Sequence, residues 1–191
     1  MREKLKLYYR CRFTQLSPLR LSGGKNDRTD NDLMLDSRGL PMIPGSALAG
    51  VLRGRLTREE ANLLFGRDTV GDAMTESAVL VGDAALPQEA AFTAWLKQNP
   101  AWADHSRVEQ LYTDVRGQTR LKDGVADDGS LRFTRVLGQY DPLDKTKALV
   151  FEAPVRLENA SPEAVRLLEH CCAATRHMGT HRNRGLGNVR L

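Results

Sequence analysis

The chain has 191 residues, of which 41% are hydrophobic and 27% charged, and its formal net charge at pH 7 is +4. This length supports one buried core, so we interpret residues 1–191 as a single domain. No apolar run approaches the length of a membrane span and no signal-peptide core is present, so we expect a cytoplasmic protein without membrane contact.

The first predicted element is a strand over residues 4–13, where apolar and polar side chains alternate almost without interruption. Tyr8 lies on its polar face, where it could stack on a nucleic-acid base. Residues 15–43 follow as a loop rich in Gly, Asp, Asn and Ser, and so long a loop is usually functional or disordered. The chain then turns at 44–46 into a helix with Ser46 as its N-cap.

The middle of the chain predicts short elements of both kinds. A helical turn is expected over 59–65, a strand over 77–84, and an inserted amphipathic helix over 88–98. Residues 116–137 predict a β-hairpin with polar, basic arms. Its tip is expected at 127–129, because the sequence Asp-Asp-Gly favours a tight turn.

The last third predicts a strand over 148–157, although Pro154 favours an edge position or a bulge. A helix over 161–178 follows, because Ser-Pro-Glu is a typical helix start. The glycine-containing loop 179–187 then leads into a last short strand over 188–191. The order strand, helix, strand, hairpin, strand, helix, strand is typical of an α+β, ferredoxin-like sheet, in which the first and last strands lie close together.

Basic residues are unevenly distributed along this order. Arginine outnumbers lysine by 21 to 7, and its planar guanidinium can hold a phosphate through two hydrogen bonds. Residues 1–20 carry six basic side chains against one acidic, and residues 170–191 carry four arginines and no carboxylate. The two basic ends predict one phosphate-binding surface if the outer strands are neighbours.

Two segments are candidate anion sites. The loop 179–187 combines three glycines with two arginines and a histidine, a pattern that can cradle phosphate with backbone amides. The same pattern is equally typical of a helix C-cap followed by a tight turn. The helix start at 44–46 would present amides and a helix dipole to an anion, with Arg53 two turns further on, but an ordinary strand-to-helix corner also fits.

Five blocks follow one another along the chain: LRLSGG, GLPMIPGSALAGVLRGRL, SAVLVGDA, VRGQTRLKDGVADDGSLRFTRVL and MGTHRNRGLGNVRL. In this order they resemble the RAMP superfamily, and above all the repeated backbone subunit of type III CRISPR effector complexes. The resemblance implies an RRM-like palm with a β-hairpin thumb, beside the helical insertion expected here. It implies as partners a guide RNA, a target RNA, further copies of the chain and other CRISPR effector subunits.

The resemblance also assigns RNA contacts to this sequence. They come from the first basic block, the helix start, the hairpin thumb and the glycine loop. The residues so assigned are Arg20, Ser46, Arg53, Arg116, Arg120, Arg132, Gly179, His181, Arg182, Arg184, Gly185 and Gly187.

The acidic part of the loop 15–43 could make the chain an enzyme. In the type III backbone subunits, a loop aspartate before the P-x-I-P-G-S block is implicated in metal-dependent cleavage of target RNA. The segment TDNDLMLD places it at Asp30, with Asp32 as second choice, and Asp30 would hold Mg²⁺ or Mn²⁺. Alternatively both are solvated loop residues of a non-catalytic, structural RNA-binding subunit. A third hypothesis is a guide-processing endoribonuclease that uses His181 as an acid or base.

Overall fold

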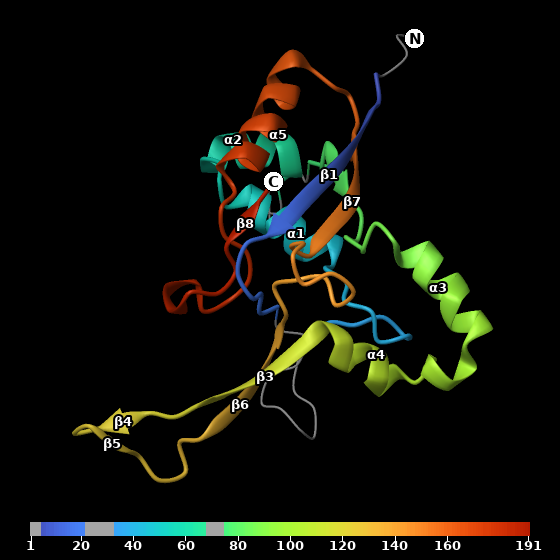
Figure 1. Ribbon diagram of the computed structural model, residues 1–191. Coiled ribbons are helices and arrows are strands. Elements are labelled where there is room, and N and C mark those ends of the chain that lie inside the picture. Colours follow the sequence, from blue (N-terminus) through green and yellow to red (C-terminus); the bar gives the residue numbers. More distant parts are fainter. Residues whose placement is uncertain (1–4, 22–32, 68–74) are drawn as a thin grey trace.

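The computed structural model describes residues 5–21, 33–67 and 75–191 (Figure 1). Its centre is a four-stranded antiparallel sheet in the order β2-β7-β1-β8. The strands are β1 (Leu7–Gln15), β2 (Val79–Val81), β7 (Val150–Leu157) and β8 (Val189–Arg190). The first and last strands are neighbours, and the α+β, ferredoxin-like fold predicted from the element order is confirmed.

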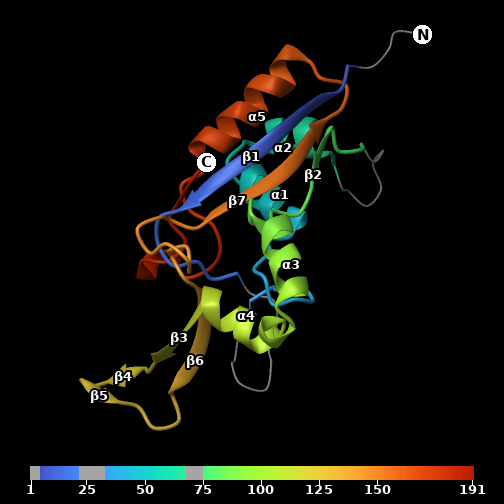
Figure 2. The same ribbon diagram turned by 45° about the vertical axis from the view of Figure 1, so that its right-hand side comes forward.

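Three helices cover one face of the sheet, namely α1 (Gly45–Arg53), α2 (Arg58–Phe65) and α5 (Pro162–Ala174) (Figures 1 and 2). Inward side chains of β1 and β7 meet beneath them, where Phe13 stacks on Phe151 with ring centroids 5.3 Å apart. None of the described helices lies over the opposite face of the sheet in either view. In the described parts of the chain, no helix combines the length and the apolar character needed to cross a bilayer.

Helix α1 begins two residues earlier than predicted, and Ser46 is not its N-cap. Pro44 occupies the cap position and makes no side-chain cap bond, while Ser46 is exposed in the first turn. The helix begins at Gly45 because this residue packs against β2, where an added Cβ would lie 2.1 Å from the Val81 carbonyl oxygen. The Gly45 N–H donates to the Asp83 carboxylate at 2.8 Å, so a protein carboxylate already occupies this helix start.

Helix α5 begins as predicted and ends four residues earlier than predicted. The Ser161 hydroxyl accepts the Ala164 N–H at 3.1 Å, with Pro162 in the first turn. The helix stops at Ala174 because Thr175 is extended, with its hydroxyl donating back to the Cys171 carbonyl at 2.8 Å. Ala164, Leu168 and Cys171 are its buried residues and face the core.

Strand β7 lies between β1 and β2, so the edge position predicted from Pro154 is wrong. Its pairing with β1 runs without interruption from Leu157 to Val150. The irregularity follows β2, where the four steps from Val81 to Ala85 oppose only three steps of β7. Pro154 lies opposite this irregular stretch. No strand-to-strand hydrogen bond requires an N–H at this position, so proline is tolerated there.

A helical insertion connects β2 to a long hairpin. It consists of α3 (Glu89–Gln98), a 3₁₀ turn (Pro100–Trp102) and α4 (His105–Tyr112). The hairpin pairs β3 (Thr113–Gln118) with β6 (Arg132–Leu137) and projects away from the sheet (Figure 1). We call residues 113–137 the thumb. A small ladder of β4 (Leu121–Lys122) and β5 (Val125–Ala126) continues it, so its outermost turn is Asp123-Gly124 and not 127–129 as predicted.

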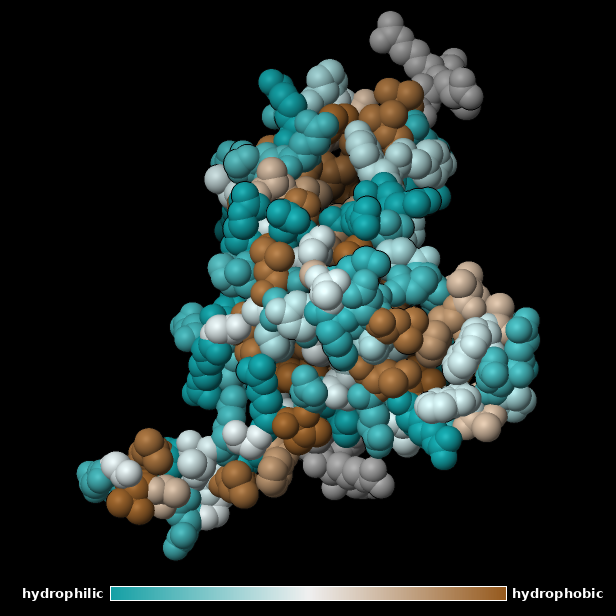
Figure 3. Space-filling model, in the orientation of Figure 1, coloured by the Kyte–Doolittle hydropathy of each residue, from teal (hydrophilic) through white to brown (hydrophobic). Residues whose placement is uncertain are grey.

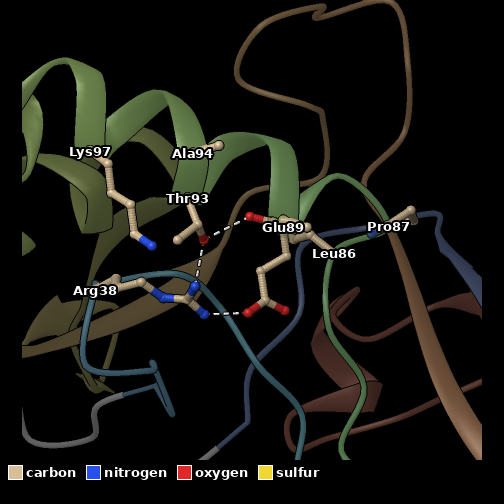
Figure 4. Close-up of a pocket in the computed structure, with 8 residues that line it drawn as sticks. Arg38, Leu86, Pro87, Glu89, Thr93, Ala94 and Lys97 are labelled. Carbon is tan, nitrogen blue, oxygen red and sulfur yellow. Dashed lines mark hydrogen bonds and ion pairs between the residues drawn. The ribbon is translucent and has the colours of Figure 1, made fainter.

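The described end of the long loop is anchored to the insertion by Arg38. The Asp36 carboxylate accepts the backbone N–H of Arg38 at 2.8 Å and of Leu40 at 2.9 Å, which closes a tight turn. Arg38 itself donates to Asp36, to the Thr93 hydroxyl and to the Glu89 carboxylate on α3 (Figure 4). The segment directly before α1 is therefore held in place by charged contacts.

Candidate nucleic-acid interface

A cavity of about 750 Å³ lies between the thumb and the glycine loop 179–187. Three segments that are distant in sequence form it: Arg20 just after β1, the inner face of the thumb, and the turn of residues 181–184. We call it the cationic cavity. Its lining residues are Arg20, Gln118, Thr119, Arg120, Asp128, Gly129, Ser130, Arg132, Thr134, His181 and Arg184, which include four arginines and one carboxylate.

Arg20 is the most deeply placed of these arginines, with only 7% of its surface exposed. Its Nη1 lies 2.9 Å from Nε2 of His181, and its Nε is buried with no hydrogen-bond partner among the described residues. Burial lowers the pKa of Arg20 from its ordinary value, and the nearby charge of Arg184 lowers it further. The described residues thus supply no acceptor for one N–H of this buried guanidinium.

His181 lies at the rim of the cavity in a left-handed backbone conformation, with φ of 59°. Its pKa is lowered first by burial and then by the positive charges of Arg20 and Arg184. The imidazole is therefore neutral at pH 7 in the free protein. An anion bound between these groups would offset both charges and raise the pKa of His181.

Two glycines of the loop 179–187 are required by close backbone packing. At Gly179, φ is 78° and an added Cβ would lie 2.2 Å from the Arg20 carbonyl oxygen. At Gly187, φ is 76° and the Cβ would lie 2.0 Å from the Met178 carbonyl oxygen. Gly185 has a similar φ of 76° but open space around it. Gly179 and Gly187 therefore pack closely against the backbone of Arg20 and Met178. Within this loop only Gly185 has open space in which a ligand could approach the backbone.

The register of the thumb determines which of its side chains face the cavity. Arg116 pairs with Thr134, and Gln118 pairs with Arg132, so all four lie on one face of the hairpin. Gln118 also accepts a hydrogen bond from Nη1 of Arg184 at 3.3 Å, which joins the thumb to the glycine loop. Arg132 has no carboxylate partner within the described parts of the chain. Its charge is therefore free to meet a phosphate.

Several predicted RNA contacts lie outside the cavity. Arg53 donates to the Gly66 carbonyl at 3.2 Å and to the Asn62 side chain at 3.2 Å. Its guanidinium therefore stabilises the C-terminal end of α2. Ser46, Arg116 and Arg182 are exposed and do not line the cavity. Arg120 does line it, but its guanidinium also donates to Asp127 at 2.8 Å.

The predicted catalytic residues Asp30 and Asp32 lie outside the described residues. Among the residues that are described, no group of three or more His, Cys, Asp or Glu side chains could hold a metal ion. Asp36, the nearest described loop carboxylate, is bound to Arg38 and to two backbone amides. The described residues therefore offer no group of three or more such ligands for Mg²⁺ or Mn²⁺.

Polar residues of the thumb complete the cavity and were not predicted. Gln118 and Thr134 line it because their side chains lie on the same face of the hairpin as those of Arg116 and Arg132. The two-residue period of the hairpin arms indicates which residues share a face. It could be used only once the pairing register was known.

The family of the chain follows from its sequence as a whole. A sequence model of the RAMP superfamily matches residues 12–190. The chain belongs to the RAMP superfamily. Among curated proteins, none matches the sequence closely enough to count as a relative.

Solved structures with the same fold include chains of two cryo-EM structures of the type III-B Cmr-beta complex. One, bound to cognate target RNA, contains a chain similar to this one with a TM-score of 0.64 and 14% identity over 97% of this chain. This RAMP protein spans 58% of the length of that chain. The other, in the apo state, contains a chain with a TM-score of 0.65 and 11% identity, over 96% of this chain and 95% of that one. At these identities the likeness establishes the fold.

Proposed function

We propose that this RAMP protein is a backbone subunit of a type III CRISPR ribonucleoprotein and binds the guide RNA in its cationic cavity. Further copies and other effector subunits would flank it, and target RNA would pair with the guide. The observation that carries the proposal is the convergence of Arg20, Arg132 and Arg184 on one cavity with a single carboxylate, Asp128. The superfamily match and the fold shared with chains of Cmr-beta structures support the choice of complex.

The chemistry of the cavity suits an RNA backbone better than a base sequence. Guanidinium groups hold phosphate oxygens through paired hydrogen bonds and carry no base preference by themselves. Gln118, Ser130 and Thr134 add neutral donors and acceptors that fit ribose hydroxyls as well as phosphates. Sequence recognition would then reside in base pairing with the guide.

Loss of two exposed cavity arginines, Arg132 and Arg184, should weaken RNA binding without changing the fold. We expect Arg132→Gln combined with Arg184→Gln to reduce the affinity for oligouridine. The slope of log K against the logarithm of the salt concentration should become shallower by about 1.4, because each lost single-strand phosphate contact removes about 0.7. Arg166→Gln, an exposed arginine on α5, is the matched control and should leave both quantities unchanged. Equal slopes for the double variant and the control would contradict the proposal.

RNA binding should strengthen as the pH falls through the ordinary range of histidine. In the free protein the pKa of His181 is lowered, and a phosphate in the cavity would raise it, so the complex takes up a proton that the free protein lacks. Affinity should therefore rise as the pH falls from about 8 to about 6, and His181→Gln should flatten the curve. Fluorescence anisotropy with labelled oligouridine at constant ionic strength measures this, and an unchanged curve in the variant would exclude His181 from the site.

We further propose that the subunit cleaves the bound target RNA, with Asp30 as the catalytic carboxylate and Asp32 as second choice. The resemblance of the segment before α1 to the backbone subunits that cut their target supports this. A divalent cation such as Mg²⁺ or Mn²⁺, held by Asp30 together with RNA phosphates, would stabilise the charge that develops at the cleaved phosphate. The Asp36–Arg38 turn would fix the described end of this loop against α3.

A further inference from the structure

The three cysteines of the chain lie together in the core, although the first is far from the other two in sequence. Cys11 lies in the middle of β1 and faces the helices, and Cys171 and Cys172 lie near the C-terminal end of α5. Figure 2 shows α5 lying along β1 on the covered face of the sheet. All three thiols are free in this structure. The cysteine cluster, as we call these three residues, therefore bridges the first strand and the last α-helix.

Cys172 is the central member of the cysteine cluster. Its sulfur is hydrogen-bonded to the thiols of both Cys11 and Cys171. Cys171 is fully buried, and its Sγ also donates to the Leu168 carbonyl oxygen at 3.1 Å, which holds this thiol to its own helix. The Cys11–Cys172 contact, in comparison, connects β1 to α5.

The two thiols of this contact differ in how readily they lose a proton. The hydrogen bonds from Cys11 and Cys171 lower the pKa of Cys172 below its ordinary value, against the opposing effect of burial. The pKa of Cys11 is raised, first by its hydrogen bond with Cys172 and then by burial. Because the thiolate is the reactive form of cysteine, Cys172 is the nucleophile of the pair and Cys11 remains a thiol.

Cys172 is also the cysteine that a small molecule can reach. It is half-buried, whereas Cys11 is only 9% exposed and Cys171 is fully buried. Apolar residues reach the surface between α5 and β1 (Figure 3). A small uncharged oxidant such as hydrogen peroxide can enter an apolar opening of this kind more easily than an ion, because no charge has to be removed from water.

We propose that the cysteine cluster is a site of reversible oxidation, at which a peroxide closes a disulfide between Cys11 and Cys172. The Cys172 sulfur attacks one peroxide oxygen, so an S–O bond forms and the O–O bond breaks. The departing hydroxide becomes water with the proton that Cys172 gives up. The Cys11 sulfur then attacks the sulfenic acid at Cys172, so an S–S bond forms, and the hydroxyl group leaves as a second water with the Cys11 proton. The two thiols lose two electrons, which reduce the peroxide to water.

The disulfide would restrain the fold without rearranging it. Two sulfur atoms that are already in contact need only side-chain rotation to form the bond. The bond closes a loop from residue 11 to residue 172 that contains most of the chain, and disulfides that close long loops restrict the unfolded chain most strongly. A thiol reductant such as glutathione would reopen it by exchange. This oxidation is independent of the proposed RNA binding, because neither cysteine lines the cationic cavity.

The test treats the reduced full-length chain with hydrogen peroxide under native conditions and then alkylates the remaining thiols in denaturant. The oxidised chain should lose the mass of two hydrogen atoms, and the number of thiols that can be alkylated should fall from three to one. Mass spectrometry of a tryptic digest without reduction should find the peptide that contains Cys11 joined to the peptide that contains Cys172. Dithiothreitol should restore all three thiols.

Cys171→Ser is the matched control, because a serine hydroxyl can donate to the Leu168 carbonyl oxygen in the same way, and this variant should still form the cross-link. Cys11→Ser and Cys172→Ser should abolish it, and circular dichroism of the reduced variants checks that they are folded. A mass loss that persists in Cys11→Ser, oxygen atoms added to Cys172 without a cross-link, or a disulfide between two chains would overturn the inference. The wild-type peptide map decides the question even if a variant fails to fold.

Discussion

A Glu109→Gln variant should be about 2 kcal/mol less stable than the wild type, which corresponds to a fall in Tm of roughly 4–8 °C for a chain of this size. Glu109 on α4 lies 2.7 Å from Arg135 on β6, and the two side chains are only 14% and 10% exposed. Neutralising Glu109 removes a charge-assisted contact in a site with little access to water, where such contacts contribute more than they do at the surface. Thermal denaturation followed by circular dichroism measures the shift.

The stability of the thumb base depends on this pair, because it joins the insertion to the hairpin. Asp144→Asn breaks the exposed pair with Lys147, whose side chains are 37% and 74% exposed, and should leave Tm unchanged. Equal effects of the Glu109 and Asp144 variants would show that the Glu109–Arg135 pair is solvated in solution.

The sheet could be predicted from the sequence because its two long strands show clear alternation. In β1 and β7 every second residue faces the helices, and the element order places the first and last strands side by side. Element ends were less predictable. Two Asp-Gly pairs lie in the thumb, at 123–124 and 128–129, and both favour turns. Only the pairing of β4 with β5 determines which of them is the outermost.

The candidate site was predictable as a set of segments and not as a set of contacts. Arg20, Arg132, His181 and Arg184 were assigned to RNA through the resemblance, and the structure brings all four to one cavity. Arg53 shows what the sequence does not predict, because nothing in it indicates that the Arg53 guanidinium is bound to the end of α2. Long-range contacts of this kind depend on tertiary packing, which local spacing does not encode.

Asp30→Ala should abolish cleavage of complementary target RNA by the assembled complex while leaving guide affinity nearly unchanged. The reason is chemical: a carboxylate that binds a divalent cation or assists the 2′-hydroxyl acts on the transition state, whereas guide binding in the cavity depends on the arginines. Loss of one such group reduces the rate by about 10²- to 10⁴-fold. Denaturing electrophoresis of labelled target RNA in Mg²⁺ follows the cut products.

Asp32→Ala and Asp36→Ala separate catalysis from a general effect on the loop. Asp36 closes the turn before α1 by accepting the amides of Arg38 and Leu40, and alanine has no side-chain acceptor, so Asp36→Ala should reduce cleavage together with a loss of thermal stability. Loss of cleavage in Asp30→Ala without a fall in Tm would assign the effect to catalysis and not to the fold of the chain. Cleavage that persists in both Asp30→Ala and Asp32→Ala would identify the protein as a structural subunit, with RNA binding in the cavity as its whole function.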